Sequence, residues 1–244
     1  MKGVILAGGN GTRLSPLTAV TNKHLLPLYD KPVIFYPLEQ LVASGIDRVM
    51  IVTSPHHMDD FVSLLGSGQN FISKKTGKQI QIVYGIQNKP GGIAEGLCIA
   101  ADYIGDEDCI LHLGDNIIEE DLTPYIKNFK KGAKIFLKEV NDPHRFGIAT
   151  IDAKMNVVGV TEKPKKPKSD LAVVGVYLFD NTVFKKMKDQ PFSERGEREI
   201  TYVINKYIKE GSVSATVLKK PWFDVGTFDS MLEASIYMKN KKHG

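Results

Sequence analysis

The chain opens with a short apolar run that breaks into a glycine-rich turn, and this turn ends in an arginine. Val4–Ala7 predicts a buried strand, and glycines follow it at positions 8, 9 and 11. Glycines let the backbone approach an anion closely, and their N–H groups can surround a phosphate. The guanidinium of Arg13 suits phosphate oxygens, and Lys23 adds a second cation. This order of residues is typical of a site for a nucleoside triphosphate.

Two familiar glycine motifs do not fit the turn. The dinucleotide fingerprint G-x-G-x-x-G begins well at Gly9 and Gly11, but Leu14 stands at its third glycine position. The Walker motif requires Gly-Lys-Ser/Thr, and Thr12 and Arg13 stand there instead. A nicotinamide oxidoreductase is therefore the weakest interpretation. A tight strand-to-helix connection remains an alternative for the glycines alone, whereas the two cations favour phosphate binding.

The composition is that of an ordinary globular protein. The chain has 244 residues, 42% apolar and 25% charged, which is enough for one large α/β domain. Its net charge of +4 is mild and suits anionic small substrates better than nucleic acid. No apolar run approaches the ~20 residues of a membrane span, and the first strand leaves no room for a signal peptide. Cys98 and Cys109 predict buried reduced thiols, so we expect a cytoplasmic protein without a membrane partner.

Strand-like and helical runs alternate through the first half of the chain, as in an α/β fold. The predicted strands after the first are Arg48–Thr53, Ile80–Tyr84, Cys109–Leu113 and Lys134–Val140. The predicted helices are Phe35–Ser44, His56–Leu65, Ile93–Tyr103 and Leu122–Lys130. This alternation predicts a Rossmann-like, mixed but mainly parallel sheet flanked by helices.

The second half of the chain is richer in short strands. Gly147–Ile151, Val157–Glu162 and Ala172–Phe179 predict a smaller antiparallel or mixed insertion on the sheet. A strand at Ser214–Leu218 and helices at about Glu197–Lys209 and Thr227–Asn240 complete the chain. We expect a single domain over residues 1–244, with halves of about 1–130 and 131–238 and a fraying basic tail at 239–244.

Several spaced motifs resemble one family. Gly8-Gly9-Asn10-Gly11-Thr12-Arg13-Leu14, followed by Asn22-Lys23-His24-Leu25-Leu26-Pro27, is similar to the signature of the sugar nucleotidyltransferases, above all the short-form glucose-1-phosphate thymidylyltransferases. The likeness runs to about Met238. It implies the nucleotide-diphospho-sugar transferase fold, with a nucleotide side in the first half and a sugar side in the second. It also implies Mg²⁺-dependent transfer from dTTP to glucose-1-phosphate, giving dTDP-glucose and pyrophosphate.

Asp115 and Asp224 are the candidate metal ligands. Asp115 follows a predicted strand, at the edge of the sheet where open α/β folds bind ligands. A carboxylate beside a triphosphate is a suitable ligand for Mg²⁺, whereas a turn or helix-cap role is the alternative from the residues alone. The segments Leu113–Asn116 and Trp222–Thr227 resemble two family motifs, and the resemblance implies that both aspartates bind the metal.

The resemblance also implies roles for the other motif residues. Gln87 belongs to a segment similar to the family's nucleobase loop, and its amide can both donate to and accept from a pyrimidine edge. The implied catalytic residues are Arg13, Lys23, Asp115, Lys163 and Arg195. The implied nucleotide-binding residues are Leu6, Gly8, Gly9, Gly11, Thr12, Arg13, Gln87, Gly92 and Asp115. The implied sugar-binding residues are Asn116, Gly147, Glu162, Lys163, Gly175, Tyr177 and Trp222.

The chain departs from the family pattern at His24, Glu95, Val174, Arg198 and Tyr202. The sequence does not decide between dTTP and UTP, because one methyl and one hydroxyl group are a small difference in a pocket. Two alternatives therefore stay open: a UTP-dependent sugar-1-phosphate uridylyltransferase, and a degenerate sensor that binds nucleotide sugars. The retained cations and aspartates argue against a sensor. The resemblance alone implies a homo-oligomer, either a dimer or a tetramer.

Overall fold

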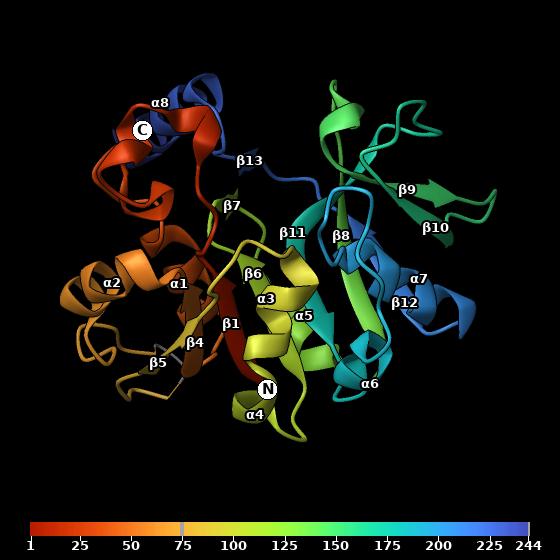
Figure 1. The fold of residues 1–244 in the computed structure, drawn as a ribbon, viewed down its shortest axis with the longest axis horizontal. Helices are drawn as coiled ribbons and strands as arrows, with labels where there is room; N and C mark the ends of the chain where they lie inside the picture. Colours follow the sequence, from red (N-terminus) through yellow and green to blue (C-terminus); the bar gives the residue numbers. More distant parts are fainter. Residues whose placement is uncertain (74–75, 244) are drawn as a thin grey trace.

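The computed structural model describes residues 1–73 and 76–243. A nine-stranded sheet forms the centre of this part of the chain (Figure 1). Its strands are β1 (Lys2–Leu6), β4 (Arg48–Thr53), β5 (Gln81–Ile86), β6 (Cys109–Leu113), β8 (Ala133–Glu139), β9 (Gly147–Ile151), β10 (Val157–Glu162), β11 (Leu171–Phe179) and β12 (Val213–Val217).

The strand order places the first half of the chain at one side of the sheet and the second half at the other. The main path is β10-β9-β11-β6-β1-β4-β5, with β8 beside β11 and β12 beside β8. Strands β6, β1, β4 and β5 run parallel, whereas β11 is antiparallel to β6, β8 and β9. The predicted mixed, mainly parallel sheet is confirmed. The predicted insertion is wrong for one of its three strands. Gly147–Ile151 and Val157–Glu162 form the β9–β10 hairpin at the sheet edge, whereas Ala172–Phe179 belongs to β11, a buried central strand that pairs with β6, β8 and β9.

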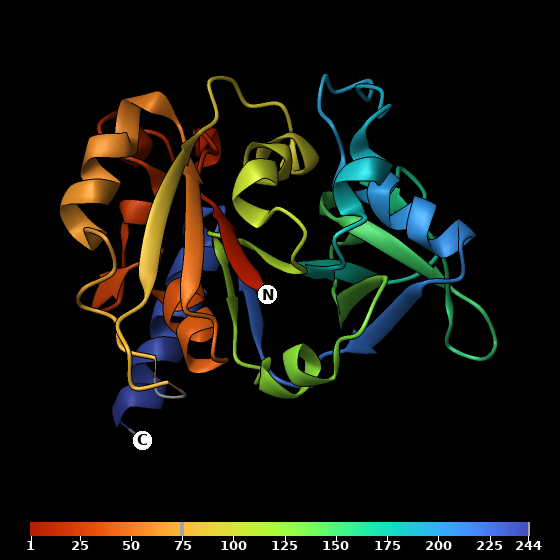
Figure 2. The same ribbon diagram turned by 90° about the horizontal axis from the view of Figure 1, so that it is seen from below.

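Helices cover both faces of the sheet. They are α1 (Phe35–Ala43), α2 (Met58–Leu65), α3 (Ile93–Ile99), α4 (Ala101–Ile104), α5 (Thr123–Asn128), α6 (Val183–Met187), α7 (Ile200–Lys209) and α8 (Phe228–His243). In Figure 2, α3 and α7 lie above the sheet, and α1 and α5 lie below it. Each face packs its own apolar cluster, and all nine residues of β11 are buried between the two. Burial of this apolar surface is the main source of stability.

Two pairs of short strands lie outside the main sheet. Strand β2 (Pro27–Leu28) pairs with β3 (Lys31–Pro32), and β7 (Asn116–Ile118) pairs with β13 (Trp222–Asp224). None of these four strands is predictable from the sequence, because two or three residues are too short to show a hydrophobic period. The second pair matters most, because it carries two motif segments of the predicted site.

Several helix boundaries differ from the predicted ones by one or two residues, and three differences are larger or change the element. The helix predicted over Ile93–Tyr103 is divided at Ala100 into α3 and α4. Helix α7 begins at Ile200 rather than Glu197. Helix α8 continues through His243, into the segment predicted as a fraying tail, because Lys241 and Lys242 form ion pairs with Glu119 and Asp30.

Both cysteines are free thiols, but only Cys109 is buried, whereas Cys98 is half-buried. Among the helices of the described residues, none is both long and apolar enough to cross a membrane.

Candidate functional site

Two adjoining cavities lie at the carboxyl ends of β1 and β6. The first, the glycine-loop cavity, has a volume of about 280 Å³ and opens beside Gly8 and Gly9. The second, the tryptophan cavity, has a volume of about 180 Å³ and contains Trp222 in its wall. Both cavities are lined by Asp115 and Lys163. Molecules bound in the two cavities would therefore meet at this aspartate and this lysine.

The structure brings most of the predicted site residues into these two linings. The glycine-loop cavity is lined by Leu6, Gly8, Gly9, Lys23, Gln87, Gly92, Asp115 and Lys163. The tryptophan cavity is lined by Arg13, Asp115, Asn116, Gly147, Glu162, Lys163, Gly175, Tyr177, Trp222 and Asp224. The remaining predicted residues lie close by: Gly11 and Thr12 form the turn that carries Arg13, and Arg195 contacts Glu162.

The glycine-rich turn after β1 aims Arg13 across the site. Gly11 has a φ of +61°, and a Cβ there would lie 2.8 Å from Cγ2 of Thr18, so the turn requires glycine. Leu14 anchors the turn because it is fully buried. A Cβ on Gly226 would lie 2.6 Å from Nη2 of Arg13. The N-terminal turn thus meets the chain just after β13, and Arg13 lies in the wall of the tryptophan cavity.

Lys23 is held at the end of β1 by its neighbours. The Asn22 side chain accepts a hydrogen bond from the N–H of His24 at 2.9 Å and donates to the carbonyl of Ala7 at 3.0 Å. This contact fixes the short helical turn Lys23–Leu25 against the strand. The ammonium of Lys23 forms an ion pair with Asp115. Burial raises the pKa of Asp115, but the charge and hydrogen bond of Lys23, together with its other polar neighbours, outweigh burial and hold this pKa well below its usual range.

His24 is a buried neutral side chain in the same turn. Burial, together with the Lys23 charge, lowers its pKa to about 3. Its Nδ1 lies 2.6 Å from the side-chain oxygen of Asn22. Since that oxygen only accepts, Nδ1 carries the proton and donates. His24 therefore adds no positive charge to the cavity at neutral pH.

The β7–β13 pair brings the two candidate metal ligands together. Asp224 pairs across the strands with Asn116, and the N–H of Val225 donates to the carbonyl of Asp115 at 2.9 Å. Burial and the Asp115 charge raise the pKa of Asp224 to about 6, although Lys23 and Arg13 oppose the shift. Two neighbouring buried carboxylates repel each other, and a bound cation would remove the repulsion.

Asn116 connects the walls of the tryptophan cavity. Its side-chain oxygen accepts hydrogen bonds from Nε1 of Trp222 at 2.7 Å and from the N–H of Gly175 at 3.0 Å. Its amide nitrogen donates to Asp115 at 3.1 Å. A Cβ on Gly175 would lie 2.6 Å from the same oxygen, so β11 can approach Asn116 only with glycine there. These contacts fix the aspartate, the indole and β11 relative to one another.

Lys163 has a strained backbone between the two cavities. Its φ is +40°, in the left-handed region that costs a residue with a Cβ about 1–3 kcal/mol. The pairing of Glu162 with Gly147 and a 3.0 Å hydrogen bond from the Lys163 N–H to the carbonyl of Phe146 maintain this conformation. Pro164 disfavours the helical region for the preceding residue. This backbone conformation places Lys163 in the lining of both cavities.

Arg195 is surrounded by carboxylates. Its guanidinium lies 2.9 Å from Glu197, 3.2 Å from Glu199 and 3.4 Å from Glu162. Burial, together with Glu199, raises the pKa of Glu162, whereas Lys163 and Arg195 oppose the rise. Glu162 and Glu197 line the two cavities, one each. Arg195 lines neither cavity itself, but it contacts one lining carboxylate of each.

The sequence analysis missed several residues of the linings. Arg145 lies in the tryptophan cavity with Nη2 3.5 Å from Asp224, and its guanidinium lies 5.3 Å above the ring of Phe146. Its only sequence signal is its position directly before Phe146 and Gly147, so a lone loop arginine gave no reason to select it. The other unpredicted lining residues are Ile93, Leu113, Phe146, Val173, Ile200, Thr201, His24, Pro90 and Glu197.

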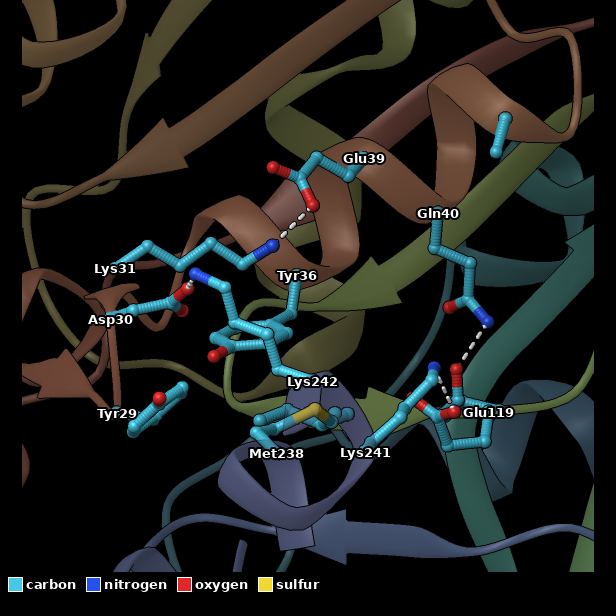
Figure 3. Close-up of a pocket in the computed structure, with 13 residues that line it drawn as sticks. Tyr29, Asp30, Lys31, Tyr36, Glu39, Gln40, Glu119, Met238, Lys241 and Lys242 are labelled. Atoms are coloured by element: carbon cyan, nitrogen blue, oxygen red, sulfur yellow. Dashed lines mark hydrogen bonds and ion pairs between the residues drawn. The ribbon is translucent and has the colours of Figure 1, made fainter. Parts of the chain in front are cut away.

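A further cavity of about 410 Å³ lies behind β7, between α1 and the end of α8 (Figure 3). Lys31 pairs with Glu39, Lys241 with Glu119, and Lys242 with Asp30. Strand β7 contributes Ile117 and Ile118 to this cavity and Asn116 to the tryptophan cavity. Most of the predicted site residues line the other two cavities, and the lining of this further cavity contains none of them.

The residues of the site fit a divalent cation. Asp115 and Asp224 are adjacent carboxylates that are largely buried, and burial together with the Asp115 charge raises the pKa of Asp224. Within the described residues, no cluster of three or more histidine, cysteine or acidic side chains forms a metal site. Two carboxylates with water and phosphate oxygens are the ligand set that Mg²⁺ commonly uses.

Comparisons with known proteins identify the family of the chain. The family model described as nucleotidyl transferase matches residues 2–241. Glucose-1-phosphate thymidylyltransferase of Mycolicibacterium smegmatis is 42% identical over 98% of this chain and 82% of its own length. The enzyme of the same name from Neisseria meningitidis is 39% identical over 98% of this chain and 83% of its own.

Two solved structures share the fold. A structure described as a glucose-1-phosphate thymidylyltransferase from Bacillus anthracis, in complex with a sucrose, superposes with a TM-score of 0.89. It is 43% identical, over 97% of this chain and 94% of that one. A UDP-glucose pyrophosphorylase complexed with UDP-glucose has a TM-score of 0.84 at 22% identity, over 98% of both chains, and supports the fold alone. The chain belongs to the nucleotidyl transferase family and is a nucleotidyltransferase enzyme.

Proposed function

We propose that the protein transfers the thymidylyl group of dTTP to glucose-1-phosphate, forming dTDP-glucose and pyrophosphate. A phosphate oxygen of glucose-1-phosphate attacks the α-phosphorus of dTTP. The bond between the α-phosphorus and its bridging oxygen breaks, and pyrophosphate leaves. A phosphate monoester is largely a dianion at neutral pH, since its second pKa is about 6. The nucleophile therefore needs no protein base.

The observation that supports this proposal most strongly is that the two cavities share Asp115 and Lys163. Nucleotide in the glycine-loop cavity and sugar phosphate in the tryptophan cavity would meet at one point. The reaction requires such a meeting, because its main barrier is the alignment of two anions for in-line displacement.

The cations of the site have separate tasks in this mechanism. The N–H groups of Gly8, Gly9 and Gly11, together with Arg13, hold the β- and γ-phosphates of dTTP. Lys23 moves from Asp115 toward the α-phosphate and stabilises the leaving group. Lys163 and Arg195 hold the phosphate of the sugar. Each preorganised charge acts where negative charge accumulates in the transition state.

The sugar and the base bind on opposite sides of this meeting point. Gln87 pairs with the pyrimidine, because its buried Nε2 has no hydrogen-bond partner within the described part of the chain. Glu162 accepts from sugar hydroxyls, and Asn116 and Trp222 shape the pocket around the ring. Asp115 and Asp224 would hold a Mg²⁺ ion, which supplies positive charge near the phosphates.

Pyrophosphate release tests the proposal. Purified protein is assayed with Mg²⁺ against dTTP, UTP, CTP and GTP, each with glucose-1-phosphate, N-acetylglucosamine-1-phosphate and mannose-1-phosphate. Release is expected to require both substrates and to be fastest with dTTP and glucose-1-phosphate. A faster reaction with UTP would replace the proposed nucleotide. Asp115→Asn is the control and is expected to lose at least about a hundredfold in rate.

If no pair of substrates releases pyrophosphate, binding distinguishes the remaining interpretations. Binding of dTTP and of dTDP-glucose is then measured by calorimetry on the same folded sample. Binding without turnover would favour the sensor interpretation over the proposed reaction. The oligomeric state, for which we propose a dimer or tetramer, is read from light scattering of that sample.

A further inference from the structure

Residues 218–221, here called the connector, join strand β12 of the main sheet to strand β13 of the small strand pair. In Figure 1 the chain runs from the right-hand part of the sheet to β13 at this point. Trp222, which lines the tryptophan cavity, follows the connector directly. The shape of the connector therefore decides where Trp222 enters the site.

Main-chain hydrogen bonds hold the two ends of the connector. The N–H of Leu218 donates to the carbonyl of Leu137 at 2.8 Å, and the N–H of Glu119 donates to the carbonyl of Pro221 at 3.1 Å. The side chain of Leu218 is buried as well. These contacts fix where the connector begins and where it ends, whereas its middle is held by a side chain of β8.

The ammonium of Lys138 contacts three successive carbonyls of the connector. Its Nζ donates to the carbonyls of Leu218 at 3.2 Å, Lys219 at 3.3 Å and Lys220 at 2.9 Å. A lysine ammonium has three N–H donors, so the connector can occupy all of them. Lys138 stands on β8 one residue beyond the last pair that β8 forms with β12. Its side chain thus continues the attachment of the chain to β8 after the strand pairing has ended.

Two contacts of Trp222 depend on the point at which β13 begins. The indole Nε1 donates to Asn116 at 2.7 Å, and the ring centre lies 5.2 Å from that of Phe146. Asp224 lies at the other end of β13, where a main-chain hydrogen bond to Asp115 holds the chain. A displaced connector would therefore move Trp222 more than Asp224.

We infer that Lys138 is a positioning residue of the sugar side: its ammonium fixes the connector and so sets the position of Trp222 in the tryptophan cavity. Lys138 lines neither the tryptophan cavity nor the glycine-loop cavity, so it acts through the connector. The inference rests on the proposed function for its ligand, glucose-1-phosphate, and adds a determinant of the affinity for that ligand.

Loss of the ammonium should loosen the connector rather than the whole fold. Lys219 and Lys220 are exposed, so water can reach their carbonyls and replace the N–H donors of Lys138. Water does not tie the connector to β8, however. The local structure should therefore change while the core of the sheet remains intact.

The fluorescence of Trp222 tests this directly, because it is the only tryptophan of the chain. Lys138→Met keeps the length of the side chain and removes all three donors. The emission should shift to longer wavelength, and acrylamide should quench it at least about twofold more strongly than in the wild type, because a loosened connector exposes the indole. The melting temperature should fall by no more than about 4 °C.

The kinetic effect should be confined to one substrate. Lys138→Met should raise the KM for glucose-1-phosphate about 5- to 20-fold and leave the KM for dTTP within about twofold, since the indole lines the tryptophan cavity and not the glycine-loop cavity. The kcat should stay within about fivefold, because Asp224 is held separately. A general loss of structure would instead change both KM values alike.

Lys134→Met is the matched control. Lys134 projects from the same face of β8, but its Nζ lies 5.6 Å above the ring of Tyr125 rather than against the connector. This variant should keep the wild-type emission and both KM values. Lys138→Arg retains the charge and the N–H donors and should lie closer to the wild type than Lys138→Met. If Lys138→Met does not fold, Lys138→Gln takes its place in the comparison with Lys138→Arg.

Three results would overturn the inference. They are wild-type emission and quenching in folded Lys138→Met, an equal rise of both KM values, and a KM for glucose-1-phosphate within twofold of the wild type. The fluorescence comparison needs no substrate. A wild type that turns over no substrate pair would contradict the proposed function, and the role of Lys138 in positioning Trp222 would still be tested by fluorescence.

Discussion

Trp222 and Asn116 are joined by a 2.7 Å hydrogen bond from the indole nitrogen to the side-chain oxygen, across the short β7–β13 pair. The same oxygen also accepts from Gly175, so one amide serves two buried donors. Asn116 in turn donates to Asp115. The sugar side of the site and its metal-binding carboxylate therefore share a single anchoring residue.

Asn116→Ala should be more harmful than Trp222→Phe for this reason. The alanine leaves the Trp222 and Gly175 N–H groups buried without a partner, which costs about 1–3 kcal/mol for each. Trp222→Phe removes the indole N–H, and the side-chain oxygen of Asn116 still accepts from the N–H of Gly175. Urea unfolding should rank Asn116→Ala at least about 1 kcal/mol below Trp222→Phe. The reverse order would show that Asn116 is not the anchor.

Lys23→Ala should lower kcat about 10²- to 10³-fold, because it removes a preorganised charge from the leaving-group side. The fold should persist, since Asn22 and Leu26 still hold the turn. Lys154→Ala is the matched control on the exposed β9–β10 turn and should keep wild-type turnover. Pyrophosphate release and circular dichroism are measured together. Near wild-type turnover of a folded Lys23→Ala protein would refute the role of this lysine.

Asp224→Asn should lower turnover and, without metal, raise the free energy of unfolding. The folded-state pKa of Asp224 is raised to about 6, so ionisation destabilises the fold increasingly as pH rises from about 4 to 6. Without metal at pH 8, the asparagine should therefore stabilise the protein by about 1–3 kcal/mol, and the gain should vanish near pH 4. Turnover should fall at least about a hundredfold.

The effect of Mg²⁺ on the melting temperature tests whether Asp224 binds the metal. The ion should raise the melting temperature of the wild type and leave that of Asp224→Asn unchanged, because the variant has lost one of the two carboxylates. The shift in the wild type should shrink as pH falls below about 6, where Asp224 takes up a proton. Equal shifts in both proteins would place the metal elsewhere.

The sequence predicts which strands and loops carry the site residues. It does not predict how segments that lie far apart in the sequence meet in space. Gly8 and Asp115 each lie two residues beyond the end of a buried strand, which places both at the same sheet edge, as is general for parallel strands. Asp115 and Asp224 are brought together by β7 and β13. These strands are too short to show the hydrophobic period that predicts a strand. Arg145 and the carboxylates around Arg195 depend on long-range packing that no local pattern encodes.

His24 should make the fold sensitive to acid. Its folded-state pKa is lowered to about 3, so the unfolded chain binds a proton that the folded chain does not as pH falls below about 6.5. Stability is therefore lost progressively on acidification, by about 2 kcal/mol at pH 5 from this residue. The unfolding free energy of His24→Gln should decline less steeply between pH 7 and pH 5. Parallel profiles of variant and wild type would assign the acid sensitivity to other groups.

In the proposed reaction, the phosphate of glucose-1-phosphate, bound in the tryptophan cavity, attacks the α-phosphorus of dTTP in the glycine-loop cavity. Glucose-1-phosphate labelled with ¹⁸O at its non-bridging phosphate oxygens tests this most directly, with products analysed by mass spectrometry. The mechanism predicts that all of the label appears in dTDP-glucose and that the pyrophosphate is unlabelled. Label in pyrophosphate, or released as inorganic phosphate, would mean that a different bond breaks and would contradict the account.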